Sequence, residues 1–303
     1  INRVYNTIMM YCRCSTFSPS KVNKYITFPA YLQLKCDGSY REAQVVTGKS
    51  VKFFSRAGKE YTNPILEEQM LSLPTGSYLG EWTIGEADSP DKNRFEGNGL
   101  LNSHNPPYSE IIFTVWDYLT QDEDRPYMSR FEHIKTILQG YSNIRVVKSS
   151  IVKSIAEALA LTKTYMNKGL EGGILKDFDY KFIDGTSLKQ YKIKLQLDAD
   201  MRITGFSEGT GKRKEYFGAI EFSNDEGTIT GSCSGFTDKL MKQINSNRDA
   251  YIGKIITIEF NDIIHQAGKY TLNHPRFLCF RDDKTDTDTL KRVLAMKHMT
   301  LSV

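Results

Sequence analysis

The sequence predicts an α+β protein with two domains, a larger mixed α/β domain followed by a small β-barrel of the oligonucleotide-binding type. The chain has 303 residues, which is enough for about two domains of ordinary size. Helix and strand patterns alternate through the first part of the chain, whereas short strand patterns separated by turn residues dominate the rest. We therefore expect one domain over residues 1–198 and a second over residues 199–303, with the boundary near Asp198 to Asp200.

Three helix patterns in the first domain carry start or stop signals. Asn63 and Pro64 suit the N-cap and the first helical position of the first pattern. Ser150 is a candidate cap and Gly169 a candidate stop for the third. The expected helices span residues 63–73, 126–139 and 150–169.

Strand patterns lie between these helices. Asp37-Gly38 is a turn signal between the first two strands and predicts a strand-turn-strand unit. The expected strands of the first domain are residues 31–34, 42–46, 110–118, 172–175 and 190–197. In the second domain four short strands and one helix suit a small barrel; the strands are residues 201–206, 216–222, 227–233 and 254–261, and the helix is 237–245.

Composition narrows the classes of function. The net charge of +4 and the pI of about 8.6 permit a polyanionic partner without requiring one. No apolar run approaches the roughly 18 residues of a membrane span, so we expect no membrane partner. The five cysteines are scattered and form neither a disulfide framework nor a zinc site, which favours a reducing cytoplasmic compartment.

The sharpest local signal is Lys35-Cys36-Asp37-Gly38, where a lysine ends an apolar strand just before a turn. Alone, this pattern is a common turn. It gains meaning from an ordered series downstream: Ser55-Arg56-Ala57-Gly58, Gly80-Glu81, Val115-Trp116-Asp117-Tyr118, Glu171-Gly172-Gly173-Ile174-Leu175-Lys176, Lys192-Ile193-Lys194 and Arg281-Asp282-Asp283-Lys284.

This order and spacing resemble the covalent nucleotidyltransferase superfamily of ATP-dependent DNA ligases and mRNA capping enzymes. Within it, the likeness is to DNA ligases of tailed bacteriophages and covers residues 25–295. It implies a nucleotidyltransferase (adenylation) domain with mixed and antiparallel sheets and flanking helices, followed by a C-terminal OB-fold β-barrel. It also implies an enzyme that uses ATP and Mg²⁺ to seal nicks in DNA through a lysyl-AMP intermediate and adenylylated DNA.

The resemblance makes Lys35 the nucleophile that takes AMP. A lysine amine attacks phosphorus only when it is unprotonated, and nearby cations disfavour the ammonium form. Lys192 and Lys194 are two residues apart on a strand and share one face. We expect both to point at the nucleotide and to lower the pKa of Lys35. By resemblance, Arg281 and Lys284 of the second domain close over ATP and orient the pyrophosphate leaving group.

The resemblance also assigns the nucleotide and metal ligands. Glu171 helps to place magnesium near the α-phosphate, and Glu81 holds the ribose hydroxyls and is a second candidate metal ligand. Trp116 stacks on adenine and Lys176 lies near the phosphates. Gln33 shares a strand face with Lys35 and can read the adenine edge through its amide; Leu34, between these two, completes the nucleotide-binding strand.

The DNA contacts implied by the resemblance begin with Arg56, which engages the 5′-phosphate of the nick and is also a nucleotide-binding candidate. Asp37 is a candidate contact to the DNA end. The basic turn Lys212, Arg213 and Lys214 suits phosphate contacts that carry no sequence information. The expected partner is nicked double-stranded DNA, and we expect a monomer acting in the cytoplasm, that of the host cell if the source is viral.

One position departs from the family pattern. The family usually has an arginine five residues after the nucleophilic lysine, and here that residue is Tyr40, followed by Arg41. Consecutive strand residues face opposite sides, so Arg41 can serve as a nucleotide ligand only if a bulge re-aims it.

Three alternative functions remain open from the residues. An RNA ligase or a capping-type nucleotidyltransferase would use the same lysine chemistry, and labelling with ATP or GTP separates the nucleotide choices. A non-catalytic nucleic-acid-binding module of the same fold would lack ATP-dependent release of pyrophosphate. An NAD-dependent ligase is disfavoured, because that class carries a cysteine-ligated zinc element, for which this sequence lacks a four-cysteine array.

Overall fold

The computed structural model describes residues 12–92, 94–120, 124–194, 197–266 and 268–302. The chain divides into two compact units, Ile1–Lys194 and Leu195–Val303. The boundary expected near Asp198 to Asp200 falls inside a strand, β13 (Leu197–Glu208), which is the first strand of the second unit. Asp200 is buried in that strand and not in a linker.

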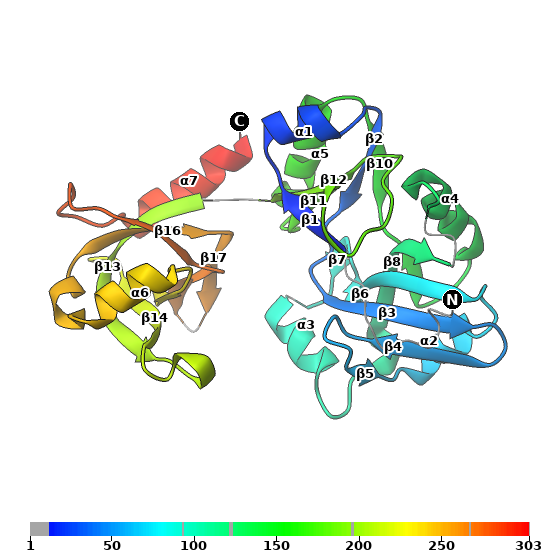
Figure 1. The fold of residues 1–303 in the computed structure, drawn as a ribbon, viewed down its shortest axis with the longest axis horizontal. Coiled ribbons are helices and arrows are strands. Elements are labelled where there is room, and N and C mark those ends of the chain that lie inside the picture. The colour runs from blue at the N-terminus through cyan, green and yellow to red at the C-terminus, as the bar shows by residue number, and fades with distance from the viewer. Residues whose placement is uncertain (1–11, 93, 121–123, 195–196, 267, 303) are drawn as a thin grey trace. The chain divides into compact units, whose positions relative to one another are not determined.

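Two β-sheets form the first unit (Figure 1). The first sheet has the order β1-β12-β11-β2-β10, with bounds Cys12–Thr16, Gly185–Lys194, Gly172–Lys176, Ala30–Leu34 and Ser149–Val152. The second has the order β5-β4-β3-β6-β8-β9, with bounds Glu60–Tyr61, Ser50–Phe54, Ser39–Val46, Gly76–Glu86, Ile111–Leu119 and Ile144–Val146; β7 (Ser89–Pro90) also pairs with β6. The mixed α+β architecture predicted from the sequence is confirmed.

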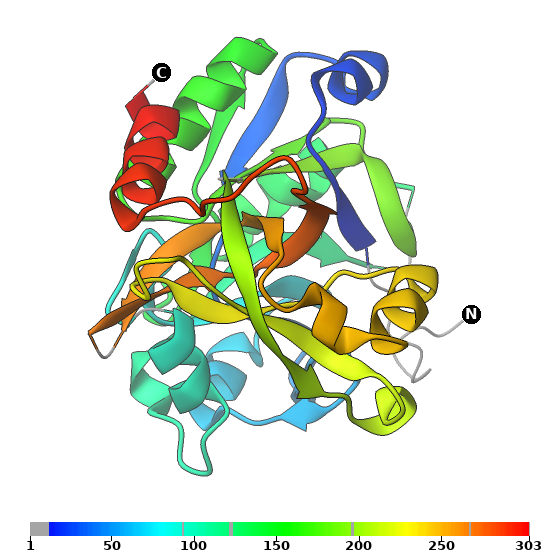
Figure 2. The same cartoon turned by 90° about the vertical axis from the view of Figure 1, so that its left-hand side faces the viewer.

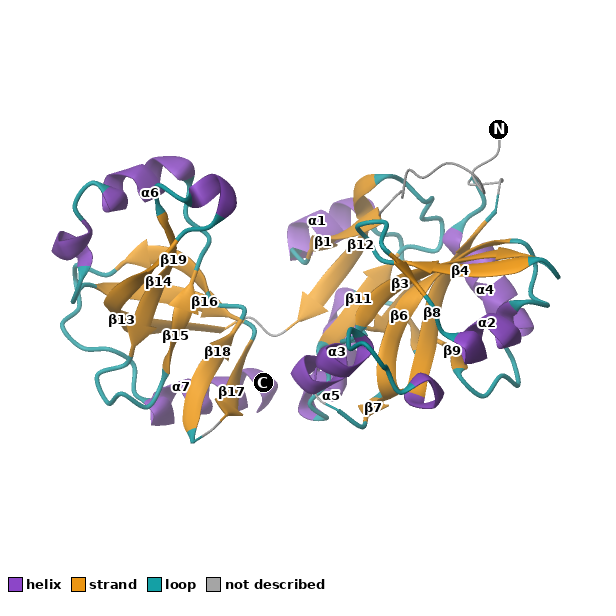
Figure 3. Cartoon of the chain, turned by 90° about the horizontal axis from the view of Figure 1, so that it is seen from below, coloured by secondary structure: helices purple, strands orange, loops and turns teal. Residues whose placement is uncertain are grey.

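Helices flank both sheets, as Figure 3 shows from below. Helices α1 (Pro19–Tyr25) and α5 (Ile155–Asn167) pack against the first sheet, while α2 (Pro64–Met70) and α4 (Tyr127–Ile137) pack against the second. Helix α3 (Arg94–Leu101) contacts β6. The predicted helices 63–73 and 126–139 are confirmed as α2 and α4 with shorter ends, and the Asn63 side chain caps α2 by accepting from the backbone N–H groups of Ile65 and Leu66.

The two strands predicted on either side of Asp37-Gly38 are present as β2 and β3, but they do not pair with each other as a hairpin. β2 pairs with β10 and β11 in the first sheet, whereas β3 pairs with β4 and β6 in the second. The chain crosses between sheets at Gly38. A Cβ there would lie 2.2 Å from the carbonyl oxygen of Trp82, so this glycine is required by a close backbone approach.

The predicted helix 150–169 begins too early. Residues Ser149–Val152 form β10, which pairs with β2, and helix α5 starts only at Ile155, with Ser154 as its N-cap. The side chain of Ser154 accepts from the N–H of Glu157. Ser150 and Ser154 both suit an N-cap by residue type. The pairing of β10 with β2 keeps Ser150 in a strand, so the helix begins after Ser154.

The second unit contains a sheet of order β15-β14-β13-β16-β19 and a hairpin β17-β18 (Figure 2). The bounds are Thr230–Cys233, Phe217–Ser223, Leu197–Glu208, Ile255–Phe260, Arg276–Phe280, Asp262–Gln266 and Lys269–Asn273. Helix α6 (Asp238–Asn245), predicted as residues 237–245 and capped by the side chain of Thr237, and helix α7 (Leu290–Ser302) complete the unit. Among the described residues, the five strands of the sheet pair in a linear order, and no ladder joins β15 to β19. Two isolated bridges join Ile229 to Tyr270 and Ser234 to Arg276. The barrel stays a prediction.

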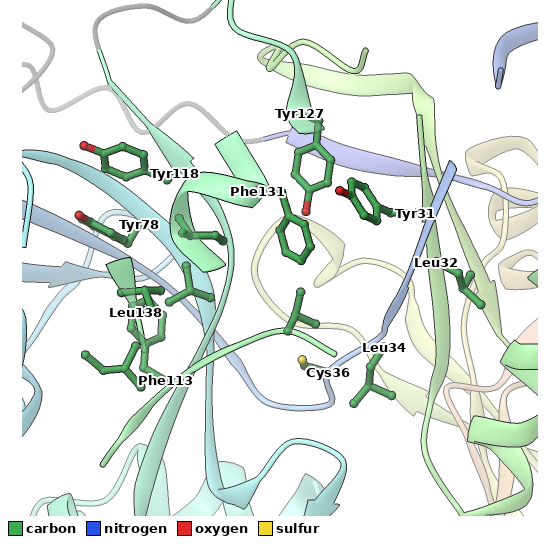
Figure 4. Packing of buried hydrophobic residues seen from close by; sticks show 14 of the residues in the cluster. Tyr31, Leu32, Leu34, Cys36, Tyr78, Phe113, Tyr118, Tyr127, Phe131 and Leu138 are labelled. Atoms are coloured by element: carbon green, nitrogen blue, oxygen red, sulfur yellow. The ribbon is translucent and has the colours of Figure 1, made fainter. Parts of the chain in front are cut away.

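A hydrophobic core draws buried residues from both sheets of the first unit and from helices α2, α4 and α5. Figure 4 shows Tyr31, Tyr127 and Phe131 side by side in this core. The ring centroids of Tyr31 and Phe131 are 5.0 Å apart and those of Tyr127 and Phe131 are 5.6 Å apart. Such aromatic pairs add to the stabilisation from buried apolar area. This core holds β2, which leads to Lys35, in a fixed position.

Candidate active site

A cavity of about 680 Å³ lies in the first unit and is lined by residues of both sheets. That volume is within the range of roughly 300–1,000 Å³ found for small-molecule sites. Eight of the predicted nucleotide, catalytic or DNA residues line it: Gln33, Leu34, Lys35, Arg56, Glu81, Trp116, Lys176 and Lys192. The sheet pairing thus brings together residues from six separate stretches of the chain.

Lys35 follows the last residue of β2, and its backbone N–H donates to the carbonyl oxygen of Gly172 at 3.0 Å. Its amine forms an ion pair with Glu171. On the other side, a carboxylate oxygen of Glu81 accepts from the N–H of Gly38 at 2.9 Å. The nucleophile predicted from sequence therefore lies at the cavity wall, beside both predicted carboxylates.

These carboxylates decide the protonation of Lys35. Burial alone lowers the pKa of the amine, but the charges of Glu171 and Glu81 outweigh burial and hold its pKa above the ordinary lysine value. The expectation that Lys192 and Lys194 lower this pKa is wrong for this arrangement, because both lie two strands away on β12. Burial also raises the pKa of Glu81, to about 7, even though Lys35 opposes the shift.

Lys192 and Lys194 share one face of β12, but only Lys192 lines the cavity. Lys192 pairs in register with Ile174, which pairs with Gln33. Lys194 pairs with Gly172, whose carbonyl oxygen accepts from the backbone N–H of Lys35. Lys192 is therefore placed level with the Gln33 part of the cavity and Lys194 level with the nucleophile.

The other end of the cavity is formed by Gln33, Trp116 and Lys176. Trp116 is half-buried and packs against Leu79, Leu119 and Phe182. Lys176 is 4% exposed; its amine lies 4.4 Å from the centre of the Tyr127 ring, and burial lowers its pKa. This end combines an aromatic wall with a fixed amide and a buried cation.

Arg41 does not reach the cavity, and no bulge re-aims it. Its side chain is 3% exposed and lies on the opposite face of the second sheet, with the guanidinium 3.7 Å from the Tyr61 ring centre and 4.9 Å from that of Trp82. The assignment of Arg41 as a nucleotide ligand is therefore corrected. Tyr40 lines the cavity instead, with its ring 6.1 Å from that of Trp116 and 5.4 Å from the guanidinium of Arg56.

Arg281 and Lys284 belong to the second unit and are both held by one carboxylate. Arg281 donates to Asp200 at 2.9 Å and also to Asp283, and Lys284 forms an ion pair with Asp200. Burial raises the pKa of Asp200, but the hydrogen bonds from Lys284 and Thr257 and the two cationic charges lower it overall.

The predicted basic turn forms the short helix η3 (Gly211–Arg213) and the residue after it. Arg213 and Lys214 are exposed, while the side chain of Lys212 lies outside the described residues. Asp37 does not line the cavity.

The carboxylates fit the magnesium ion that the sequence pattern implies. The described part of the chain contains no cluster of three or more His, Cys, Asp or Glu side chains arranged as a metal site. Magnesium, however, is usually bound through one or two carboxylates together with substrate phosphates and waters. Glu171 and Glu81, which both act on the Lys35 amine, supply that number.

Two contributions to the site escaped the sequence reasoning. Strand β1 pairs in parallel with β12 and places Cys12, Cys14 and Thr16 on the cavity wall. The hydroxyl of Tyr127, on helix α4, accepts hydrogen bonds from the side chains of Gln33 and Lys176. Alternation in residues 12–16 hinted at β1, but no local signal identifies its partner strand. Nothing in the sequence marks the hydroxyl of Tyr127.

Among the described helices, none has the length and apolar character needed to span a membrane.

Comparison with known proteins agrees with this geometry. A family model described as an ATP dependent DNA ligase domain matches residues 92–194. The chain is 27% identical to the DNA ligase of Enterobacteria phage T4 and 28% identical to that of phage T6; each alignment covers 94% of this chain and 71% of the phage protein. A solved structure from a structure-function analysis of Lig E DNA ligases superposes with a TM-score of 0.68 at 17% identity, covering 90% of this chain and all of that one, which shows a shared fold.

Proposed function

The chain belongs to the ATP-dependent DNA ligases, and from that premise we propose that it joins the 5′-phosphate and 3′-hydroxyl of nicks in duplex DNA through Lys35. The observation that carries the proposal is that Lys35 and Glu81 line one cavity, with Glu171 ion-paired to the Lys35 amine.

In the first step the unprotonated amine of Lys35 attacks the α-phosphorus of ATP, a P–N bond forms, and the bond to the β-phosphate oxygen breaks to release pyrophosphate. The carboxylates raise the pKa of Lys35, so its amine is protonated before substrate binds. Magnesium bound by Glu171 and Glu81 would neutralise the two carboxylates, which would remove their stabilisation of the ammonium and favour release of its proton to solvent. Magnesium, when bound by Glu171 and Glu81, supplies charge neutralisation for the phosphates.

The remaining cavity residues position the nucleotide. Trp116 offers a ring for stacking on adenine, and Gln33 an amide for its edge. Lys176 and Lys192 supply positive charge for the phosphates, with Lys194 near the nucleophile. Catalysis of phosphoryl transfer depends mainly on such positioning and charge placement.

AMP then passes from Lys35 to the 5′-phosphate of the nick, and the 3′-hydroxyl displaces AMP to form the phosphodiester. Arg56, at the cavity wall beside Tyr40, is suited to the 5′-phosphate. Asp37 is a candidate contact at the DNA end. In the second unit, which we propose to be an OB-fold barrel, Lys212, Arg213 and Lys214 would bind backbone phosphates, and Arg281 and Lys284 would orient the pyrophosphate. We propose that the chain acts as a monomer in the cytoplasm, that of the host cell if the source is viral.

The test is a nick-sealing assay on a labelled DNA duplex, with and without ATP and magnesium. Incubation with α-labelled ATP and a denaturing gel reports the covalent adduct. A chain that seals nicked RNA but not nicked DNA, or that is labelled by GTP and not by ATP, contradicts the proposal.

A further inference from the structure

The hydroxyl of Tyr127 connects three groups at the base-binding end of the cavity. It donates to the carbonyl oxygen of Trp116 at 2.6 Å. The side-chain nitrogen Nε2 of Gln33 donates to the Tyr127 oxygen at 2.7 Å, and the amine of Lys176 donates to the same oxygen at 3.3 Å. Tyr127 is fully buried and does not line the cavity, so it acts only through these neighbours.

The donors and acceptors fix the direction of every bond in this set. A backbone carbonyl can only accept, so the single hydroxyl hydrogen of Tyr127 is committed to Trp116. A lysine ammonium can only donate, so it occupies one lone pair of the Tyr127 oxygen. Towards Gln33 the tyrosine can therefore only accept. If the amide of Gln33 were turned over, its oxygen would face the tyrosine oxygen with no hydrogen between them, at a buried position where an unpaired polar group is costly.

We propose that Tyr127 sets the nucleobase specificity of the cavity by holding the Gln33 amide with its nitrogen inward and its oxygen Oε1 towards the bound base. This inference rests on the proposed function, in which the cavity holds the base of a nucleoside triphosphate. Tyr127 is a positioning residue, and Gln33 is the group that meets the base.

The direction of the amide matters because purines differ at position 6. Adenine carries an amino group there and donates, whereas hypoxanthine and guanine carry a carbonyl oxygen and accept. A glutamine side chain that can turn over suits either kind of base. One whose oxygen is locked towards the cavity accepts from the adenine amino group and opposes a 6-oxo base through two facing acceptors. A site built around a fixed polar group rejects the wrong partner far more strongly than an apolar site does.

The inference is tested with Tyr127→Phe, which removes the hydroxyl and keeps the buried ring. The measurement is kcat/KM for formation of the lysyl-nucleotide adduct with ATP and with inosine triphosphate, which differs from ATP at position 6 and has no 2-amino group. We expect the ATP preference to fall by about ten-fold or more, because the freed amide can turn its NH₂ towards a 6-oxo base. The substitution also removes the hydrogen bond from Lys176, so the comparison in a Gln33→Leu background separates the effect of the Gln33 amide on the ratio from that of Lys176.

Tyr31→Phe is the matched control. Tyr31 lies in the same aromatic cluster, 6.0 Å from the Tyr127 ring, but its hydroxyl donates to Glu132 on helix α4. This variant should leave the ATP to inosine triphosphate ratio unchanged. A second comparison repeats Tyr127→Phe in a Gln33→Leu background, where the ratio should no longer respond to the tyrosine hydroxyl. A ratio that still shifts there, or one unmoved in Tyr127→Phe alone, overturns the proposal.

A measurement on the unaltered protein covers the case in which Tyr127→Phe does not fold. Purine riboside triphosphate has neither donor nor acceptor at position 6. Adduct formation should be fastest with ATP, slower with purine riboside triphosphate and slowest with inosine triphosphate. If inosine triphosphate is used better than purine riboside triphosphate, Gln33 presents its NH₂ and the assignment is wrong. Absence of any adduct with ATP would instead contradict the proposed function.

Discussion

The predicted phosphate-binding cations have opposite surroundings in the two units. In the first unit Lys176 is buried at the cavity without an ion pair among the described residues, and its pKa is lowered by burial. In the second unit Arg281 and Lys284 share Asp200 and are more exposed. The cavity therefore holds a cation ready for an anion, whereas the second unit holds cations that must first exchange a carboxylate for a phosphate.

This difference bears on how each region is used. An unpaired buried ammonium is costly in the free protein and recovers that cost when an anionic ligand arrives, so the cavity is preorganised for its ligand. Paired cations are stable without ligand and contribute less when a phosphate replaces the carboxylate. Lys35 combines both behaviours, since it lines the cavity but is paired with Glu171.

The largest effect should follow from Lys35→Ala. Without the amine no P–N bond can form, and the labelled AMP adduct should fall to background. The fold should survive, because the Lys35 side chain lies at the cavity wall and is 23% exposed. Lys189→Ala is the control, since Lys189 pairs with Asp177 and does not line the cavity. A full-strength adduct in Lys35→Ala would remove the central assignment.

Lys176→Met should come next. It removes the unpaired cation but keeps the length and apolar character of the side chain, so adduct formation with ATP should slow by about 10²- to 10³-fold, as for loss of one preorganised charge-stabilising group. Thermal unfolding should show a stability equal to or above that of the parent, because a buried charge is lost. A rate within a few-fold of the parent would mean that Lys176 does not act on the phosphates, and the contrast between the two regions would lose its functional meaning.

Asp200→Asn tests the paired region. The pKa of Asp200 is lowered in the folded state, so its contribution to stability is present above the unfolded value of about 3.9 and is lost as pH falls through the lower folded value. The parent should therefore lose more stability than Asp200→Asn between about pH 5 and pH 2. At neutral pH the variant should be less stable by about 1–3 kcal/mol, because Arg281 and Lys284 lose their shared partner. Denaturant unfolding across that pH range measures both, and parallel pH curves for the two proteins would refute the account.

Sequence predicted the residues of the cavity better than the connections that assemble it. Lys35, Glu81 and Trp116 lie where their motifs indicated, because each motif joins a side chain to a local strand pattern. The partner of each strand depends on pairing between distant segments. This is why the sequence around Ser150 favours a helix start although these residues form β10, and why no local pattern identifies the partner of β1.

The helix ends illustrate the same limit. The sequence predicts the cap Asn63 correctly, since capping uses atoms within one turn. For helix α5 two serines four residues apart both suit a cap, and only the pairing of Ser149–Val152 with β2 excludes the earlier one. The direction of the Gln33 amide is harder still to predict from the sequence, because it depends on the hydroxyl of a residue on helix α4.

Arg41 gives the smallest expected effect and the sharpest test of which strand face meets the nucleotide. Its guanidinium is stacked on Tyr61 and Trp82, and its Nε and Nη2 atoms have no hydrogen-bond partner among the described residues. Replacing an imperfectly satisfied buried charge by an apolar side chain of similar length is often close to neutral. Arg41→Met should therefore change the free energy of unfolding by no more than about 1 kcal/mol and leave KM for ATP unchanged. Tyr40→Ala, on the cavity face of the same strand, should instead raise that KM, because it removes the ring beside Trp116. A raised KM in Arg41→Met with an unaffected Tyr40→Ala would place the nucleotide on the other face of β3.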